Sequence, residues 1–172
     1  IEAAFSQGLP NTPMADSTVR VISGNFVTAR PVGIVEGINF EHSGVVRKVD
    51  VAGIQRSLDM DALVLLSPFG FSPTGEALNL NMEEVATSVA VALKSDKLIF
   101  MTEIAGLRVR PEDPQSEDNP LDTELPLAQA KELLARVPPS QRPSDIAFYL
   151  QHCVKACQGG VERSHIIPFA VD

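Results

Sequence analysis

Residues 62–101 read ALVLLSPFGFSPTGEALNLNMEEVATSVAVALKSDKLIFM, two apolar runs separated by a loop and a helix-like segment. Ala62–Leu66 is continuously apolar, a pattern typical of a strand buried on both faces of a parallel sheet. Met82–Leu93 carries apolar residues at four-residue spacing and predicts a helix. Lys97–Met101 predicts the next buried strand. This order predicts two parallel strands joined by a helical crossover.

The same alternation of strands and helices continues on both sides of this stretch. Strands are predicted at Thr18–Ile22 and Arg163–Phe169, and helices at Val51–Leu58, Leu127–Arg136 and from Ser144 to about Gln158. We therefore expect an α/β fold with a mainly parallel sheet, in which ligands bind beyond the carboxyl ends of the strands.

Irregular segments are predicted where glycine, proline or acidic residues gather. Phe26–Val49 predicts a β-hairpin excursion, because short apolar pairs alternate with glycines. Residues 1–17, Pro68–Gly75 and Pro138–Pro143 predict loops or linkers. Arg110–Pro126 predicts an exposed acidic loop.

Composition and charge narrow the class of protein. The 172 residues are 44% apolar and 21% charged, as in a globular domain. The net charge is −8 (14 − 22), and there are 9 aromatic residues (8 Phe and 1 Tyr) without Trp. These values disfavour nucleic-acid binding, which needs clustered Lys and Arg. Neither a membrane span nor a signal peptide is predicted, so we expect a cytoplasmic protein.

Two cysteines and two histidines near the C-terminus form no recognised metal-binding pattern. Cys153 and Cys157 lie on one apolar helical stripe and predict core packing rather than a disulfide or a zinc site. His152 lies off that stripe. We therefore predict no metal site.

The start of the helix that follows residue 78 is the most informative candidate site. Asn79 could donate its amide to a small carboxylate, since a helix N-terminus attracts anions. The alternative is structural, with Asn79 a turn residue and Asn81 the helix cap, completed by Glu84 as a capping box.

Three stretches carry a resemblance to a known family: Asn79–Ala86 (NLNMEEVA), Lys97–Leu107 (KLIFMTEIAGL) and Gly159–Ile167 (GGVERSHII). Together they resemble the amino-acid kinase family. Within it the chain is most similar to the kinase-like domain that precedes the acetyltransferase domain of bacterial N-acetylglutamate synthases. Further likeness lies in Ser23–Val27, His42–Arg47 and Val154–Cys157.

The resemblance implies a three-layer α/β/α sandwich over residues 1–172, incomplete at both ends, with an acetyltransferase domain beyond residue 172. It implies a regulatory domain that senses L-arginine, in a homo-oligomeric parent that transfers acetyl from acetyl-CoA to L-glutamate. This segment would hold no cofactor and no catalytic residue. Asn79, Glu83 and His165 would be its ligand-binding residues. For His165 the alternative is a strand-end histidine hydrogen-bonded to backbone.

Two other functions stay open. An active acetylglutamate kinase would use ATP, with Asn79 holding acetylglutamate and Glu83 in place of the family's Asp. The resemblance places Leu150 where active kinases carry a lysine, and a neutral side chain cannot stabilise charge on a transferring phosphoryl group. The remaining alternative is a scaffold that binds no ligand and contributes only oligomer contacts.

Overall fold

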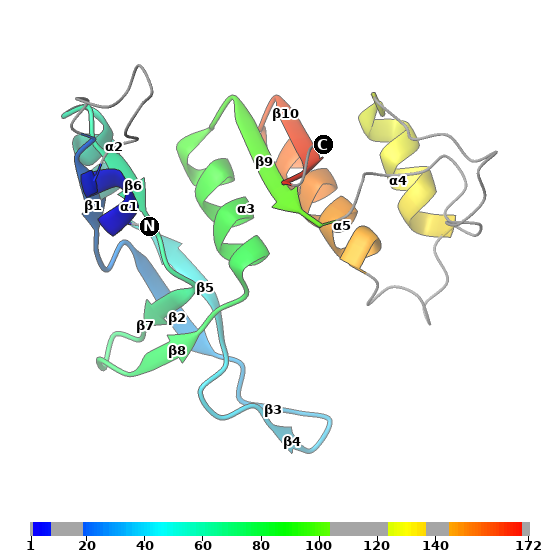
Figure 1. Cartoon of the computed structure of the whole chain (residues 1–172). Coiled ribbons are helices and arrows are strands. Elements are labelled where there is room, and N and C mark those ends of the chain that lie inside the picture. Colours follow the sequence, from blue (N-terminus) through cyan, green and yellow to red (C-terminus); the bar gives the residue numbers. More distant parts are fainter. Residues whose placement is uncertain (1, 8–18, 104–123, 137–144, 170–172) are drawn as a thin grey trace. The chain divides into compact units, whose positions relative to one another are not determined.

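The computed structural model describes residues 2–7, 19–103, 124–136 and 145–169, and the chain divides into two compact units, residues 1–85 and 86–172. Elements of the first unit (Figure 1) are α1 (Glu2–Gln7), β1 (Val21–Ser23), β2 (Val27–Pro31), β3 (Ile34–Val35), β4 (Ile38–Asn39), β5 (Gly44–Val49), α2 (Val51–Leu58), β6 (Leu63–Leu65), β7 (Phe69–Phe71) and β8 (Ala77–Asn79). Helix α3 (Met82–Leu93) crosses the division. The second unit adds β9 (Lys97–Thr102), α4 (Leu127–Arg136), α5 (Asp145–Gln158) and β10 (Arg163–Pro168).

Parallel pairing joins strands that are distant in sequence. β1 pairs with β6, β9 with β10, and β2 with β7, all in parallel. Antiparallel pairs occur within the hairpins β2–β5, β3–β4 and β7–β8. The predicted α/β class is therefore confirmed, and the hairpin excursion predicted over 26–49 contains β2 to β5.

A four-stranded sheet in the order β5-β2-β7-β8 forms the centre of the first unit. Its two edges meet, because Asn79 at the end of β8 makes a parallel bridge to Ser43 just before β5. Leu78 is fully buried inside this curled sheet. Two glycines leave room for the inner side chains. A Cβ on Gly44 would lie 2.8 Å from the Leu78 Cβ, and one on Gly70 would lie 2.6 Å from the Ala29 Cβ.

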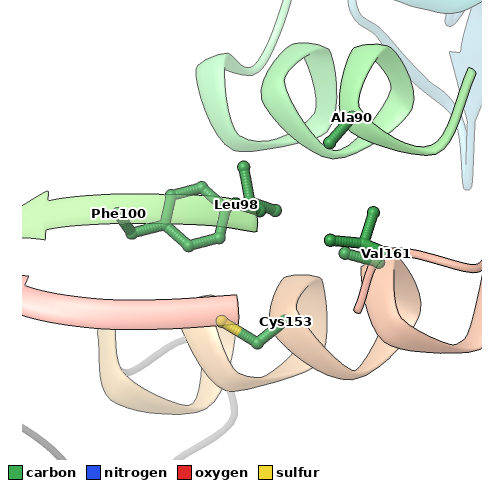
Figure 2. Packing of buried hydrophobic residues seen from close by; sticks show 6 residues of the cluster. Ala90, Leu98, Phe100, Cys153 and Val161 are labelled. Carbon is green, nitrogen blue, oxygen red and sulfur yellow. The ribbon is translucent and has the colours of Figure 1, made fainter. Parts of the chain in front are cut away.

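A cluster of buried apolar side chains forms the centre of the second unit. Figure 2 shows its buried side chains between the elements that carry them: Ala90 of α3, Leu98 and Phe100 of β9, Cys153 of α5, and Val161. The buried and exposed residues of β9 alternate strictly along the strand. Among the described residues, Ile99 and Met101 are exposed, so the strand predicted to be buried is buried on one face.

Helix α5 also packs against α4. Ala130 and Leu133 of α4 meet Leu150 and Val154 of α5 in a separate buried cluster. Helix α5 ends at Gln158, as predicted, and Gly160 just beyond it has a positive φ of 103°, which suits glycine and lets the Val161 N–H donate to the Ala156 carbonyl.

Other differences from the sequence prediction are local. Residues 2–7 are helical rather than loop, and β7 lies inside the predicted loop 68–75. The first strand is shifted to Val21–Ser23, and the three residues of β6 are only half-buried. Most of the predicted acidic loop and the whole linker 138–143 lie outside the described residues.

Candidate functional site

Asn79 is the last residue of β8, and its backbone is fixed on both sides. Its N–H donates to the His42 carbonyl at 2.7 Å, while its partner across the β7–β8 ladder is Phe69. The Asn79 side chain is exposed, and within the described residues its amide makes no hydrogen bond. The interpretation of Asn79 as a turn residue is therefore wrong, because it belongs to a strand.

Helix α3 begins two residues later and is capped as predicted. The Glu84 N–H donates to the Asn81 Oδ1 at 2.9 Å, which satisfies one of the free N–H groups of the first turn. Glu83 and Glu84 lie in that first turn and are half-buried. Carboxylates at this end of a helix interact favourably with its dipole. Glu83 thus has a structural reason to be acidic besides any contact with a ligand.

His165 lies in the middle of β10, opposite Ile99 of β9. Its neighbours Ser164 and Ile166 face helix α5 and the buried cluster, so His165 lies on the opposite face of this pair of strands. The side chain is half-buried. Its Nε2 atom is buried and has no hydrogen-bond partner in the part of the chain that the structure describes.

The structure places the three predicted ligand-binding residues in two units. Asn79 and Glu83 lie four residues apart at the junction of β8 and α3 in the first unit, whereas His165 belongs to the second unit. That these three residues bind one ligand therefore stays a prediction.

Buried polar contacts of α5 were not predicted. His152 is buried and its Nδ1 lies 3.0 Å from the Thr87 Oγ1 of α3, while the Phe148 ring lies edge-on to it with centroids 4.7 Å apart. No pattern in the sequence indicated this pair, because His152 lies off the apolar stripe that carries Cys153 and Cys157. The contact links α3 to α5 inside the second unit.

The two cysteines are free thiols, as predicted. Cys153 lies in the apolar cluster, and burial, with a smaller contribution from Cys157, raises the pKa of its thiol to about 12 against the lowering effect of Ser164. The Cys157 Sγ lies 3.4 Å from the Ser164 Oγ. The raised pKa keeps the Cys153 thiol protonated at neutral pH, so Cys153 is a poor nucleophile or metal ligand. The described residues contain no group of three or more His, Cys, Asp or Glu able to hold a metal.

Comparisons with known proteins agree with this α/β architecture and identify the family. The amino acid kinase family model matches residues 1–168, and the chain belongs to that family.

Curated relatives of the chain are named amino-acid acetyltransferase, and two of them show how far the similarity extends. The relative from Ralstonia nicotianae is 56% identical over 172 residues, which is all of this chain and 36% of the relative. The relative from Aeromonas salmonicida is 47% identical over all of this chain and 38% of its own length. The chain therefore spans just over a third of the relatives it matches.

Among solved structures, N-acetylglutamate synthase from Neisseria gonorrhoeae complexed with coenzyme A and L-arginine matches with a TM-score of 0.78 and 34% identity, over 94% of this chain and 35% of that one. Carbamate kinase from Giardia lamblia bound to AMP-PNP matches with a TM-score of 0.60 at 15% identity, over 73% of this chain and 41% of that one. The carbamate kinase likeness shows the fold alone.

Proposed function

We propose that the chain is the regulatory, kinase-like domain of an N-acetylglutamate synthase. The observation that carries this proposal is the 56% identity to an amino-acid acetyltransferase over the full length of the chain. The synthase from Neisseria gonorrhoeae, which has a similar fold, was solved with coenzyme A and L-arginine. An acetyltransferase domain beyond residue 172 would complete the polypeptide.

The reaction of that polypeptide moves an acetyl group from the thioester sulfur of acetyl-CoA to the amino nitrogen of L-glutamate. A C–S bond breaks, a C–N bond forms, and the amino group loses a proton as the CoA thiol gains one. The present domain contributes no group to this step. Its role is to bind L-arginine and to couple that binding to the acetyltransferase domain of a homo-oligomer.

The environment of Leu150 disfavours the alternative acetylglutamate kinase. Leu150 is 3% exposed and packs against Ala130 and Leu133 of α4. A charged lysine at this position would be buried in an apolar cluster, at a large desolvation cost. The resemblance places the lysine of active kinases at this position. Leu150 carries no charge, so it cannot stabilise the negative charge on a phosphoryl group during transfer.

Asn79, Glu83 and His165 are the proposed ligand-binding residues. An exposed amide at Asn79 suits a carboxylate, and the half-buried carboxylate of Glu83 suits an ammonium group. For His165 the support is the buried Nε2 without a partner among the described residues, because a ligand group that reaches it would satisfy that atom.

The described helices include none long and apolar enough to cross a membrane.

Arginine inhibition of the full-length polypeptide tests the proposal. His165→Ala should abolish or weaken inhibition by L-arginine while CoA release from acetyl-CoA and L-glutamate is kept. His42→Ala, which removes an exposed histidine of the first unit, is the control and should leave inhibition unchanged. Unchanged inhibition in His165→Ala would remove this residue from the site.

Ligand-dependent stability separates the regulatory domain from a ligand-free scaffold. L-Arginine that binds only the folded state raises the unfolding temperature by mass action. An unfolding temperature of the full-length polypeptide that does not respond to L-arginine would favour the scaffold.

A further inference from the structure

The division between the two units falls inside helix α3. Val85 is the last residue of the first unit and Ala86 is the first of the second, yet both belong to the single helix Met82–Leu93. Helix α3 is therefore the connection along the chain through which a change in the second unit reaches the first. The contacts that hold the second-unit part of α3 decide how firmly such a change is passed on.

A buried polar contact just beyond this division joins α3 to α5. Thr87 is fully buried, and its Oγ1 lies 3.0 Å from the Nδ1 of His152, which is 8% exposed. The rings of Phe148 and Phe100 lie edge-on to the imidazole, with centroids 4.7 Å and 6.5 Å away. Apolar contacts allow two helices to slide, whereas a hydrogen bond is directional and costly to leave unmade in such surroundings. The pair therefore fixes the position of α3 along α5.

Helix α5 is attached to β10 by a second polar contact. The Ser164 hydroxyl donates to the Cys153 carbonyl at 3.5 Å and lies 3.4 Å from the Cys157 Sγ. Cys153 follows His152 directly in α5, and Ser164 directly precedes His165 in β10. Helix α5 is thus bonded on one side to α3 and on the other side to the strand that carries His165.

We propose that the Thr87–His152 pair couples L-arginine binding in the second unit to helix α3, and through α3 to the first unit. This inference rests on the proposed function, in which His165 binds L-arginine. A shift of β10 on binding would carry α5 with it through Ser164 and the apolar cluster, and α5 would carry α3 through the buried pair. Packed side chains and hydrogen bonds between rigid elements can transmit coupling of this kind. Thr87 and His152 act as positioning residues.

The test uses the full-length polypeptide and measures inhibition separately from binding. Inhibition is the ratio of CoA release without L-arginine to release at saturating L-arginine, and binding is the rise in unfolding temperature that L-arginine causes. Thr87→Val keeps the side-chain shape but removes the hydroxyl. It should keep uninhibited CoA release and stabilisation by L-arginine, whereas the inhibition ratio should fall by at least about twofold. Thr87→Ser keeps the hydroxyl and should restore inhibition.

Two further variants separate coupling from a loss of stability. Ser57→Ala is the matched control, because it removes a buried hydroxyl that donates to the Gly53 carbonyl within α2 of the first unit. It should leave the inhibition ratio unchanged. His152→Phe keeps a ring but removes the nitrogen. The double variant Thr87→Val/His152→Phe should lose no more inhibition than the weaker single variant, because both substitutions remove the same contact.

Each alternative result has a definite meaning. If the parent polypeptide releases CoA but does not respond to L-arginine, the proposed function and the inference both fall. If the parent is inhibited and Thr87→Val is inhibited equally, only the inference is overturned. It is also overturned if Thr87→Val is no longer stabilised by L-arginine, because the pair then maintains the binding site itself. A matching loss of inhibition in Ser57→Ala would assign the effect to stability and overturn it as well.

Discussion

Gly70→Ala should destabilise the first unit, because the methyl group has no space inside the curled sheet. The new Cβ would lie 2.6 Å from the Ala29 Cβ and 2.9 Å from the Leu80 Cδ1. Carbon atoms in contact prefer about 3.5–4.0 Å, so the two strands must separate by about 1 Å. Overpacking of this kind costs about 1–3 kcal/mol, from which the lower entropy of the unfolded alanine chain subtracts about 0.4–1 kcal/mol.

Urea unfolding measures this cost. With a net loss of about 1–2 kcal/mol and a slope of about 2 kcal/mol per molar urea, the midpoint should fall by roughly 0.5–1 M. Gly24→Ala is the control, since its Cβ would meet only the Phe26 ring, at 3.3 Å, and that side chain can rotate away. Its midpoint should stay within about 0.3 M of the parent chain.

A second substitution isolates the contact responsible. Ala29→Gly removes the methyl group nearest to the new Cβ, so the double variant Ala29→Gly/Gly70→Ala should be more stable than the sum of the single effects predicts. A Gly70→Ala chain as stable as the parent, or strictly additive single effects, would refute the packing described for β2 and β7.

Three further substitutions test the interior. Leu78→Ala empties a fully buried position and should cost about 2–5 kcal/mol in urea unfolding, with a loss under 1 kcal/mol contradicting its burial. Thr87→Val keeps the shape but removes the hydroxyl bonded to His152, and should cost about 1–3 kcal/mol by the same measurement. Because the folded-state pKa of Cys153 is raised to about 12, its contribution to stability is complete below about pH 9 and is lost as the pH rises toward 12. Cys153→Ala should therefore flatten the decline in unfolding free energy between pH 8 and pH 10.5.

The helices could be predicted from sequence because their signals are local. The bounds of α2, α3 and α4 coincide with the predicted ranges, since apolar periodicity, Asn81 and Pro126 define them within a few residues. The predicted C-terminal end of α5, about Gln158, is also confirmed, because two glycines follow it directly.

Short strands and the faces of strands could not be predicted in this way. β7 has three residues between Pro68 and Ser72, and its pairing with β2 and β8 joins segments about 40 and 8 residues away. The apolar run of β9 does not reveal that Ile99 and Met101 face away from the helices. The pairing of Phe69 with Asn79 could not be predicted either, because the register of the β7–β8 hairpin decides which residues lie opposite each other.

We propose that this domain regulates a glutamate acetyltransferase and does not transfer phosphate. The most direct measurement follows free CoA released from acetyl-CoA by the full-length polypeptide, with and without L-glutamate and L-arginine. We expect release that depends on L-glutamate and changes with L-arginine. No release from an intact, folded polypeptide, together with ADP formation from ATP and N-acetyl-L-glutamate, would contradict the claim and restore the kinase.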